Sequence, residues 1–240
     1  MSVRYRAPVS SDGAANRTPL ETATPLEMLG VLASQDKDVG PGLRHIELYC
    51  SRGLMTVLWH GEPDAPAAVV MLGGAMGGLL GPVGGLYHDL GVFLAGQGFG
   101  ALRVSYRRAN DLDECCIDAA AAVQLAIGNG ASRVAILGHS FGGAVAVRVG
   151  VGLPDMVTGV ATFATQSAGC EMAAGLRGRS LLLFHGERDE ILPPMTSEVV
   201  REIAGTGELV ICPNDGHLFS RSREILWERL LEWLPGVLTG

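Results

Sequence analysis

Charged and aromatic residues are scarce in this chain, at 18% and 5% of its 240 residues. No apolar run approaches the roughly 18 residues that a membrane-spanning helix needs. The amino-terminal stretch MSVRYRAPVSSDGAANRT also lacks the apolar core of a signal peptide. We therefore expect no membrane partner and a cytoplasmic location.

Basic clusters and cysteine patterns are missing as well. The net charge is −7, which argues against nucleic acid as a partner. The cysteines are odd in number and form no C-x-x-C pair of the kind used for zinc or redox chemistry; they are Cys50, Cys115, Cys116, Cys170 and Cys212. We expect buried or half-buried thiols, and no metal or cofactor.

Hydrophobic residues make up 48% of the chain, which indicates a globular protein. Residues 1–40 are polar and rich in Pro, Ser, Thr and Asp, apart from a short apolar piece at 25–32 that Thr24 could cap as a helix. We interpret 1–40 as an amino-terminal arm, a candidate contact for a homodimer, and 41–240 as a single α/β domain.

The order of elements predicts an α/β fold with a mostly parallel central sheet and helices on both faces. An antiparallel hairpin is expected at 44–49 and 54–59. Further strands are expected at 67–72, 100–106, 134–137, 157–165, 180–185 and 208–212, and helices at 86–95, 114–127, 193–204 and 222–233.

The stretch RVAILGHSFGGAVAVRVG, 133–150, contains the pattern G-x-S-x-G between an apolar strand and a small-residue helix. In that context the pattern predicts a nucleophile elbow centred on Ser140. Glycines two residues before and two after the serine allow the backbone to approach without a Cβ clash. The turn directs the backbone N–H of Phe141 toward an oxyanion formed on a substrate bonded to Ser140.

A serine hydroxyl needs a base, and groups that meet the elbow must follow the carboxyl ends of strands. His217, in PNDGHLF just after the last strand, fits best because Gly216 lets its loop bend back. His185 also ends a strand but precedes a charged turn. We expect His139, inside the elbow, to point away from Ser140.

The orienting carboxylate is expected in the turn after strand 180–185. Asp189 is our first candidate because its short side chain suits holding an imidazole in one tautomer. Glu187 and Glu190 are alternatives in the same turn, and Asp215 is an alternative on the histidine loop.

Four segments together resemble the α/β-hydrolase fold family: LGGAMGG after the third strand, GHSFGG, HGERDEILPP and NDGHLF. The resemblance runs from about residue 44 to the carboxyl terminus and includes the chain order Ser, Asp, His. It implies an oxyanion hole formed by the N–H groups of Phe141 and Ala75. Many members have His-Gly before the second donor, whereas this chain has Gly73-Gly74.

The resemblance also bears on the substrate. Only 166–179 separates the strand 157–165 from the next one, which leaves no room for the helical cap that many members insert here. We expect an open crevice for a small-molecule acyl substrate, with Met76, Leu79 and Gln166 as candidate pocket residues. The glycine-rich loop lacks G-x-G-x-x-G and Gly-Lys-Ser/Thr, which argues against nucleotide binding.

We therefore expect a carboxylesterase-like serine hydrolase that cleaves small esters through an acyl-serine. A thioesterase, peptidase or acyltransferase using the same three residues is the alternative. A ligand-binding protein that keeps the fold without turnover is the alternative of another class.

Overall fold

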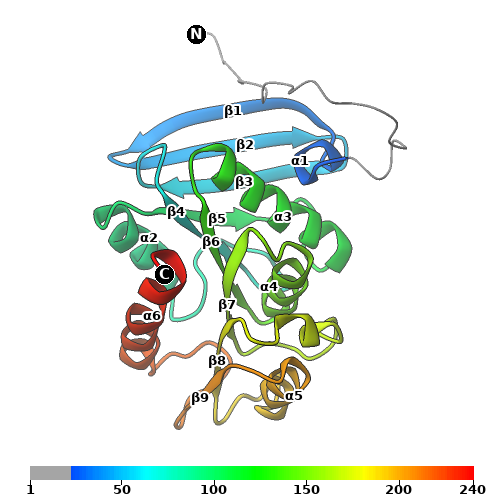
Figure 1. The fold of residues 1–240 in the computed structure, drawn as a ribbon, viewed down its shortest axis with the longest axis vertical. Helices are drawn as coiled ribbons and strands as arrows, with labels where there is room; N and C mark the ends of the chain where they lie inside the picture. The colour runs from blue at the N-terminus through cyan, green and yellow to red at the C-terminus, as the bar shows by residue number, and fades with distance from the viewer. Residues whose placement is uncertain (1–22) are drawn as a thin grey trace.

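A computed structural model describes residues 23–240, which form a nine-stranded sheet in the order β1-β2-β3-β5-β4-β6-β7-β8-β9 (Figure 1). The strands are β1 (Val31–Gly40), β2 (Leu43–Cys50), β3 (Gly53–His60), β4 (Ala67–Leu72), β5 (Gly100–Ser105), β6 (Arg133–His139), β7 (Val157–Phe163), β8 (Ser180–Gly186) and β9 (Glu208–Cys212). The α-helices are α1 (Pro25–Met28), α2 (Leu86–Gly96), α3 (Leu112–Gly128), α4 (Phe141–Gly152), α5 (Met195–Ala204) and α6 (Arg223–Leu238), and a 3-10 helix covers Ala173–Leu176.

Strands β5, β4, β6, β7, β8 and β9 are parallel, and β1 to β3 extend the sheet antiparallel through the pairing of β3 with β5. The expected fold class is confirmed. Strand β4 is buried along its whole length, as its continuous apolar run predicts for a strand covered on both faces.

Two layers of helices cover the sheet (Figure 1). Helices α3, α4 and α5 pack on one face, and α2 and α6 pack on the other. No helix within residues 23–240 combines the length and apolarity needed to cross a membrane.

The amino-terminal part of the sheet differs from expectation. The helix capped by Thr24 ends at Met28, and Val31–Gly40 is a strand paired with β2 rather than part of an arm. Most of β1 is exposed, so its sequence carries no alternating apolar signal, and pairing with β2 decides its conformation. An ion pair between Arg44 and Asp36 joins the two strands. Residues 1–22 of the expected arm lie outside the described part of the chain.

Helix α6 continues to Leu238, beyond the expected end at residue 233, although it contains Pro235. The reason lies in packing, because Val237 and Leu238 are both buried against the sheet. The carbonyl of Val237 also accepts hydrogen bonds from Arg133 and Thr158.

A cluster of aromatic rings anchors the loop that follows β9. Phe219 on this loop is fully buried and meets Phe163 of β7 edge to face, with ring centroids 6.3 Å apart. Phe163 in turn stacks on Phe184 of β8 at 5.2 Å. The loop is thereby held over the carboxyl ends of two parallel strands.

A second anchor lies under the loop that follows β4. Arg103 of β5 is buried, and its Nε donates to Nε2 of His60 at 3.0 Å. Its Nη1 reaches the carbonyl oxygen of Leu79 at 3.4 Å. Burial, and then the charge of Arg103, lower the pKa of His60 to about 4. The ring is therefore neutral and accepts this hydrogen bond at pH 7.

Replacing Phe219 by Ala should lower the free energy of unfolding by about 3–5 kcal/mol, because it removes a fully buried ring and leaves a cavity. Urea denaturation measures the loss. Leu218→Ala is the matched control: its side chain is 59% exposed, and a change of under about 0.5 kcal/mol is expected. Equal effects of the two substitutions would contradict the anchoring role of Phe219.

His60 should also make stability depend on pH. Below about pH 6.5 the unfolded chain binds a proton at His60, whereas the native chain binds that proton only when the pH falls to about 4. The free energy of unfolding should therefore fall, by up to about 3 kcal/mol, as the pH drops through this window. His60→Gln keeps an acceptor for Arg103 without titrating, so its urea midpoint should fall less steeply over the same range. An unchanged slope would argue against a neutral, buried His60.

Candidate active site

The elbow begins where β6 ends. Ser140 has φ 56° and ψ −120°, a conformation that is costly for a residue with a Cβ. Its N–H donates to the carbonyl of Phe163 at 2.7 Å, and its own carbonyl accepts from Gly143 at 2.9 Å. The strained serine is thus held by the neighbouring strand and by the first turn of α4.

Three glycine residues around Ser140, which have no Cβ, make this turn possible. A Cβ on Gly138 would overlap the carbonyl of Gly142, and a Cβ on Gly142 would overlap the carbonyl of Gly73. A Cβ on Gly143 would collide with Thr165. The elbow therefore packs backbone against backbone on both sides, and glycine is required at these positions.

Asp189 and His217 come together from different loops. Asp189 follows β8, His217 follows β9, and His217 Nδ1 lies 2.7 Å from Asp189 Oδ2. Both residues are buried, at 9% and 8% exposure. The second carboxylate oxygen, Oδ1, accepts the backbone N–H groups of Ile191 and Leu192 at 2.8 Å each. The carboxylate is therefore fixed, and Nε2 is the ring nitrogen of His217 that remains for other partners.

The three alternative carboxylates, Glu187, Asp215 and Glu190, do not contact the ring of His217. Glu187 is exposed and accepts the backbone N–H of Asn214 at 2.8 Å. Asp215 accepts the N–H groups of Gly216 and Arg221, at 2.9 and 2.8 Å, so it shapes the histidine loop from within. Glu190 is exposed. Asp189 is the one among these four residues that contacts the ring of His217.

The histidine loop reaches the elbow through His139. Its Nε2 donates to the carbonyl of His217 at 3.0 Å, and the two rings lie 5.0 Å apart. Burial lowers the pKa of His139 to about 4, so it is neutral at pH 7. Sequence analysis assigned no role to this residue. Because it directly precedes Ser140, its contact joins the loop carrying His217 to the elbow.

Near Ser140, the backbone N–H groups of Phe141 and Ala75 donate to none of the turn and loop carbonyls of residues 23–240, and the same holds for their neighbours Gly142 and Met76. Phe141 opens α4, where the first N–H groups have no acceptor inside the helix. Ala75 stands in the tight turn closed by the hydrogen bond from Gly77 N–H to the carbonyl of Gly74. A Cβ on Gly74 would lie 3.6 Å from that of Ser140, so this turn borders the elbow.

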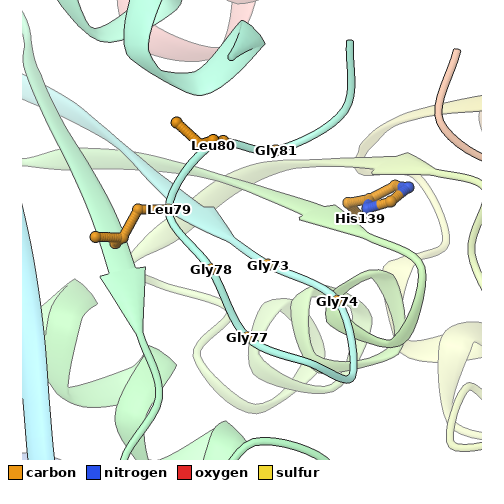
Figure 2. Close-up of a pocket in the computed structure, with 8 residues that line it drawn as sticks. All are labelled: Gly73, Gly74, Gly77, Gly78, Leu79, Leu80, Gly81 and His139. Carbon is orange, nitrogen blue, oxygen red and sulfur yellow. The ribbon is translucent and has the colours of Figure 1, made fainter. Parts of the chain in front are cut away.

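A small open pocket of about 160 Å³ lies beside this turn, as Figure 2 shows. It is lined by Gly73, Gly74, Gly77, Gly78, Leu79, Leu80, Gly81 and His139. Of the three candidate pocket residues, Leu79 is among these. Met76 is instead 96% exposed, and the amide of Gln166 donates to the carbonyl of Ala168. Met76 turns outward because the glycine turn beside it bends the chain sharply.

The loop after β4, residues 73–85, is the glycine loop, and the loop after β9, residues 213–222, is the histidine loop. They are joined directly by the N–H of Val83, which donates to the carbonyl of Leu218 at 2.9 Å. Within residues 23–240, no group of three or more His, Cys, Asp or Glu side chains is placed to hold a metal ion. The arrangement offers instead a strained serine, an oriented imidazole and free backbone donors, which are the parts used in nucleophilic acyl transfer.

No protein-family model and no curated protein matches the chain. Solved structures do match. Est1E from Butyrivibrio proteoclasticus has a TM-score of 0.68 at 15% identity, over 82% of this chain and 99% of that one. Dienelactone hydrolase from Anabaena variabilis has a TM-score of 0.68 at 16% identity, over 85% and 99%.

A third similar structure is XC6422 from Xanthomonas campestris, described as an α/β serine hydrolase without a lid. Its TM-score is 0.65 at 18% identity, over 85% of this chain and 99% of that one. The likeness extends over nearly the full length of these proteins. The chain therefore has the α/β-hydrolase fold, with no cap domain among residues 23–240.

Proposed function

We propose that this protein is a serine hydrolase that cleaves small acyl esters, with Ser140 as nucleophile, His217 as base and Asp189 as the carboxylate that orients the base. The observation that carries the proposal is the buried 2.7 Å hydrogen bond between His217 Nδ1 and Asp189 Oδ2, on a loop joined to the strained serine turn through His139. Nucleophile, base and orienting group are the parts that activation of a serine requires.

In the proposed reaction, Oγ of Ser140 attacks the ester carbonyl carbon while Nε2 of His217 takes the hydroxyl proton. Asp189 stabilises the resulting imidazolium. The oxyanion accepts the N–H groups of Phe141 and Ala75. The intermediate then expels the alcohol, which receives the proton from Nε2. Water then attacks the acyl carbon and loses a proton to the same nitrogen. The bond from the acyl carbon to Oγ breaks, Nε2 returns the proton to Oγ, and the acid and free Ser140 are released.

The size of the pocket supports a small acyl group. At about 160 Å³, it is smaller than the roughly 300–1,000 Å³ of sites that enclose drug-sized ligands. Glycine backbone forms most of its wall, so selection by shape is expected to dominate over hydrogen bonding by side chains. We infer that the acyl part is short and that the alcohol part extends into the open crevice.

The similar structures favour an oxygen ester over a thioester or an amide. One is named a dienelactone hydrolase, and Est1E has been solved with ferulic acid bound. A dienelactone is a cyclic oxygen ester, and ferulic acid is a carboxylic acid. Cleavage of an ester or lactone is the corresponding reaction for this protein.

Incubation with a small fluorophosphonate should add a single adduct to the intact protein, because an activated serine attacks phosphorus as it attacks a carbonyl. Ser140→Ala should fold normally, give no adduct and lose nearly all ester hydrolysis. Mass spectrometry and hydrolysis of 4-nitrophenyl acetate measure both effects. A folded wild-type protein that gives no adduct would indicate the ligand-binding alternative instead.

Asp189→Asn should reduce kcat/KM by about 10⁴-fold, since an amide favours the wrong tautomer of His217. Glu187→Gln is the matched control, because this carboxylate binds a backbone N–H of the histidine loop and not the ring. It should stay within about threefold of the wild type. A mild effect of Asp189→Asn would require a different acid.

A further inference from the structure

A second histidine lies against Asp189. His185, near the end of β8, has a fully buried side chain, with no exposure. Its Nε2 lies 2.9 Å from the carbonyl oxygen of Leu192 and 3.3 Å from Oδ2 of Asp189. This is the same carboxylate oxygen that His217 Nδ1 approaches at 2.7 Å. The two imidazoles therefore share one oxygen.

The partners of His185 determine its tautomer. The carbonyl of Leu192 and the carboxylate of Asp189 only accept hydrogen bonds, so Nε2 must carry the proton. Nδ1 lies 2.7 Å from Oγ of Ser197, a fully buried residue of α5. Burial lowers the pKa of His185, so the ring is neutral. Ser197 O–H accordingly donates to Nδ1.

These contacts complete the environment of the carboxylate. Oδ1 is held by two backbone N–H groups, of Ile191 and Leu192. Oδ2 faces His217 and His185. Oδ1 has two donors, and Oδ2 has His217 as its donor with Nε2 of His185 in contact at 3.3 Å. The carboxylate therefore cannot rotate without losing contacts. The backbone donors fix the acid loop, whereas His185 alone approaches from the strand and acts on the oxygen that serves His217.

We propose that His185, locked in one tautomer by Ser197, is a positioning residue that fixes Asp189 Oδ2 and weakens its attraction for a protonated His217. The inference deepens the proposed function, since it concerns the base of the same reaction. A donor on Oδ2 disperses the negative charge that would stabilise the imidazolium.

Other ionisable groups surround His217 and have to be considered in any pH measurement. The charged and titratable groups on the elements packed against it are Asp189, His185, His139, Asp215, Glu187, Glu190, Arg188 and Arg221. Of these, Asp215 and Glu187 are engaged by backbone N–H groups, and a Cβ on Gly216 would lie 2.8 Å from Oε2 of Glu190. Apart from His185, these groups are unchanged in the variants below. A difference between variants in the pH midpoint therefore reports the effect of His185.

The test compares His185→Leu, His185→Gln and Ser197→Ala with the wild type. Leucine removes the donor, whereas the glutamine amide places an N–H near the position of Nε2. Thr162→Val is the matched control for Ser197→Ala. Its hydroxyl is also fully buried, on the adjoining strand β7, but has no hydrogen-bond partner among the described residues. Circular dichroism and urea midpoints establish that each variant is folded.

Two readouts follow His217 in each variant. One is the pH dependence of kcat/KM for 4-nitrophenyl acetate, whose midpoint reports the pKa of the base in the free enzyme. The other is the downfield proton resonance of His217 Nδ1–H, which needs no turnover. In His185→Leu we expect kcat/KM to fall about 10- to 100-fold and the midpoint to rise by about one pH unit.

We expect His185→Gln to restore the midpoint, Ser197→Ala to raise it by a smaller amount, and Thr162→Val to leave it unchanged. A purely structural role would lower kcat/KM equally at every pH. The proposal is overturned if His185→Leu is folded with an unmoved midpoint and proton resonance, or if glutamine restores neither. If His185→Leu does not fold, an unmoved midpoint in Ser197→Ala overturns it.

Failure of the proposed function would be seen separately, as an unlabelled Ser140 in the wild type. The proton resonance would still report whether His185 acts on the Asp189–His217 pair.

Discussion

Close packing of backbone at the end of β6 is the constraint on which the site depends. Gly138 and Gly142 leave no room for a Cβ, and Gly142 also abuts the carbonyl of Gly73 at the end of β4. The helix after the serine can therefore start directly against two strands. Ser140 keeps its positive φ because the surrounding backbone hydrogen bonds hold the turn. The strain of one residue is supported by contacts from three elements.

Parallel strands bring the remaining groups to the same edge. The loops after β4, β8 and β9 all leave the sheet where the elbow does, and they are linked to one another at short range. Val83 binds the histidine loop, Phe219 anchors that loop in the core, and His139 connects it to the elbow. Since these links use backbone groups and buried rings, they fix the loops relative to the elbow, as the proposed stabilisation of an oxyanion requires.

Buried neutral histidines recur around this edge. His60 supports the anchor of the glycine loop, His139 holds the histidine loop, and His185 contacts the acid. Burial lowers the pKa of each of them. A neutral imidazole is a rigid donor and acceptor that adds no net charge, so it can fix neighbouring groups by hydrogen bonds without burying a further ion at this edge.

Local patterns in the sequence were sufficient for the order of most elements and for the sharp turn at Ser140, because strand periodicity and glycine spacing are short-range properties. They also placed His217 and Asp189 after neighbouring strands, where the two side chains meet. They did not predict β1, whose exposed residues follow the pairing with β2. They also missed His185 with Ser197, which lie twelve residues apart and meet only through packing of α5 on β8. The sequence by itself determined which residue types follow which strands. The tertiary structure alone decided which side chains share an oxygen, since that depends on loop paths set by contacts distant in the chain.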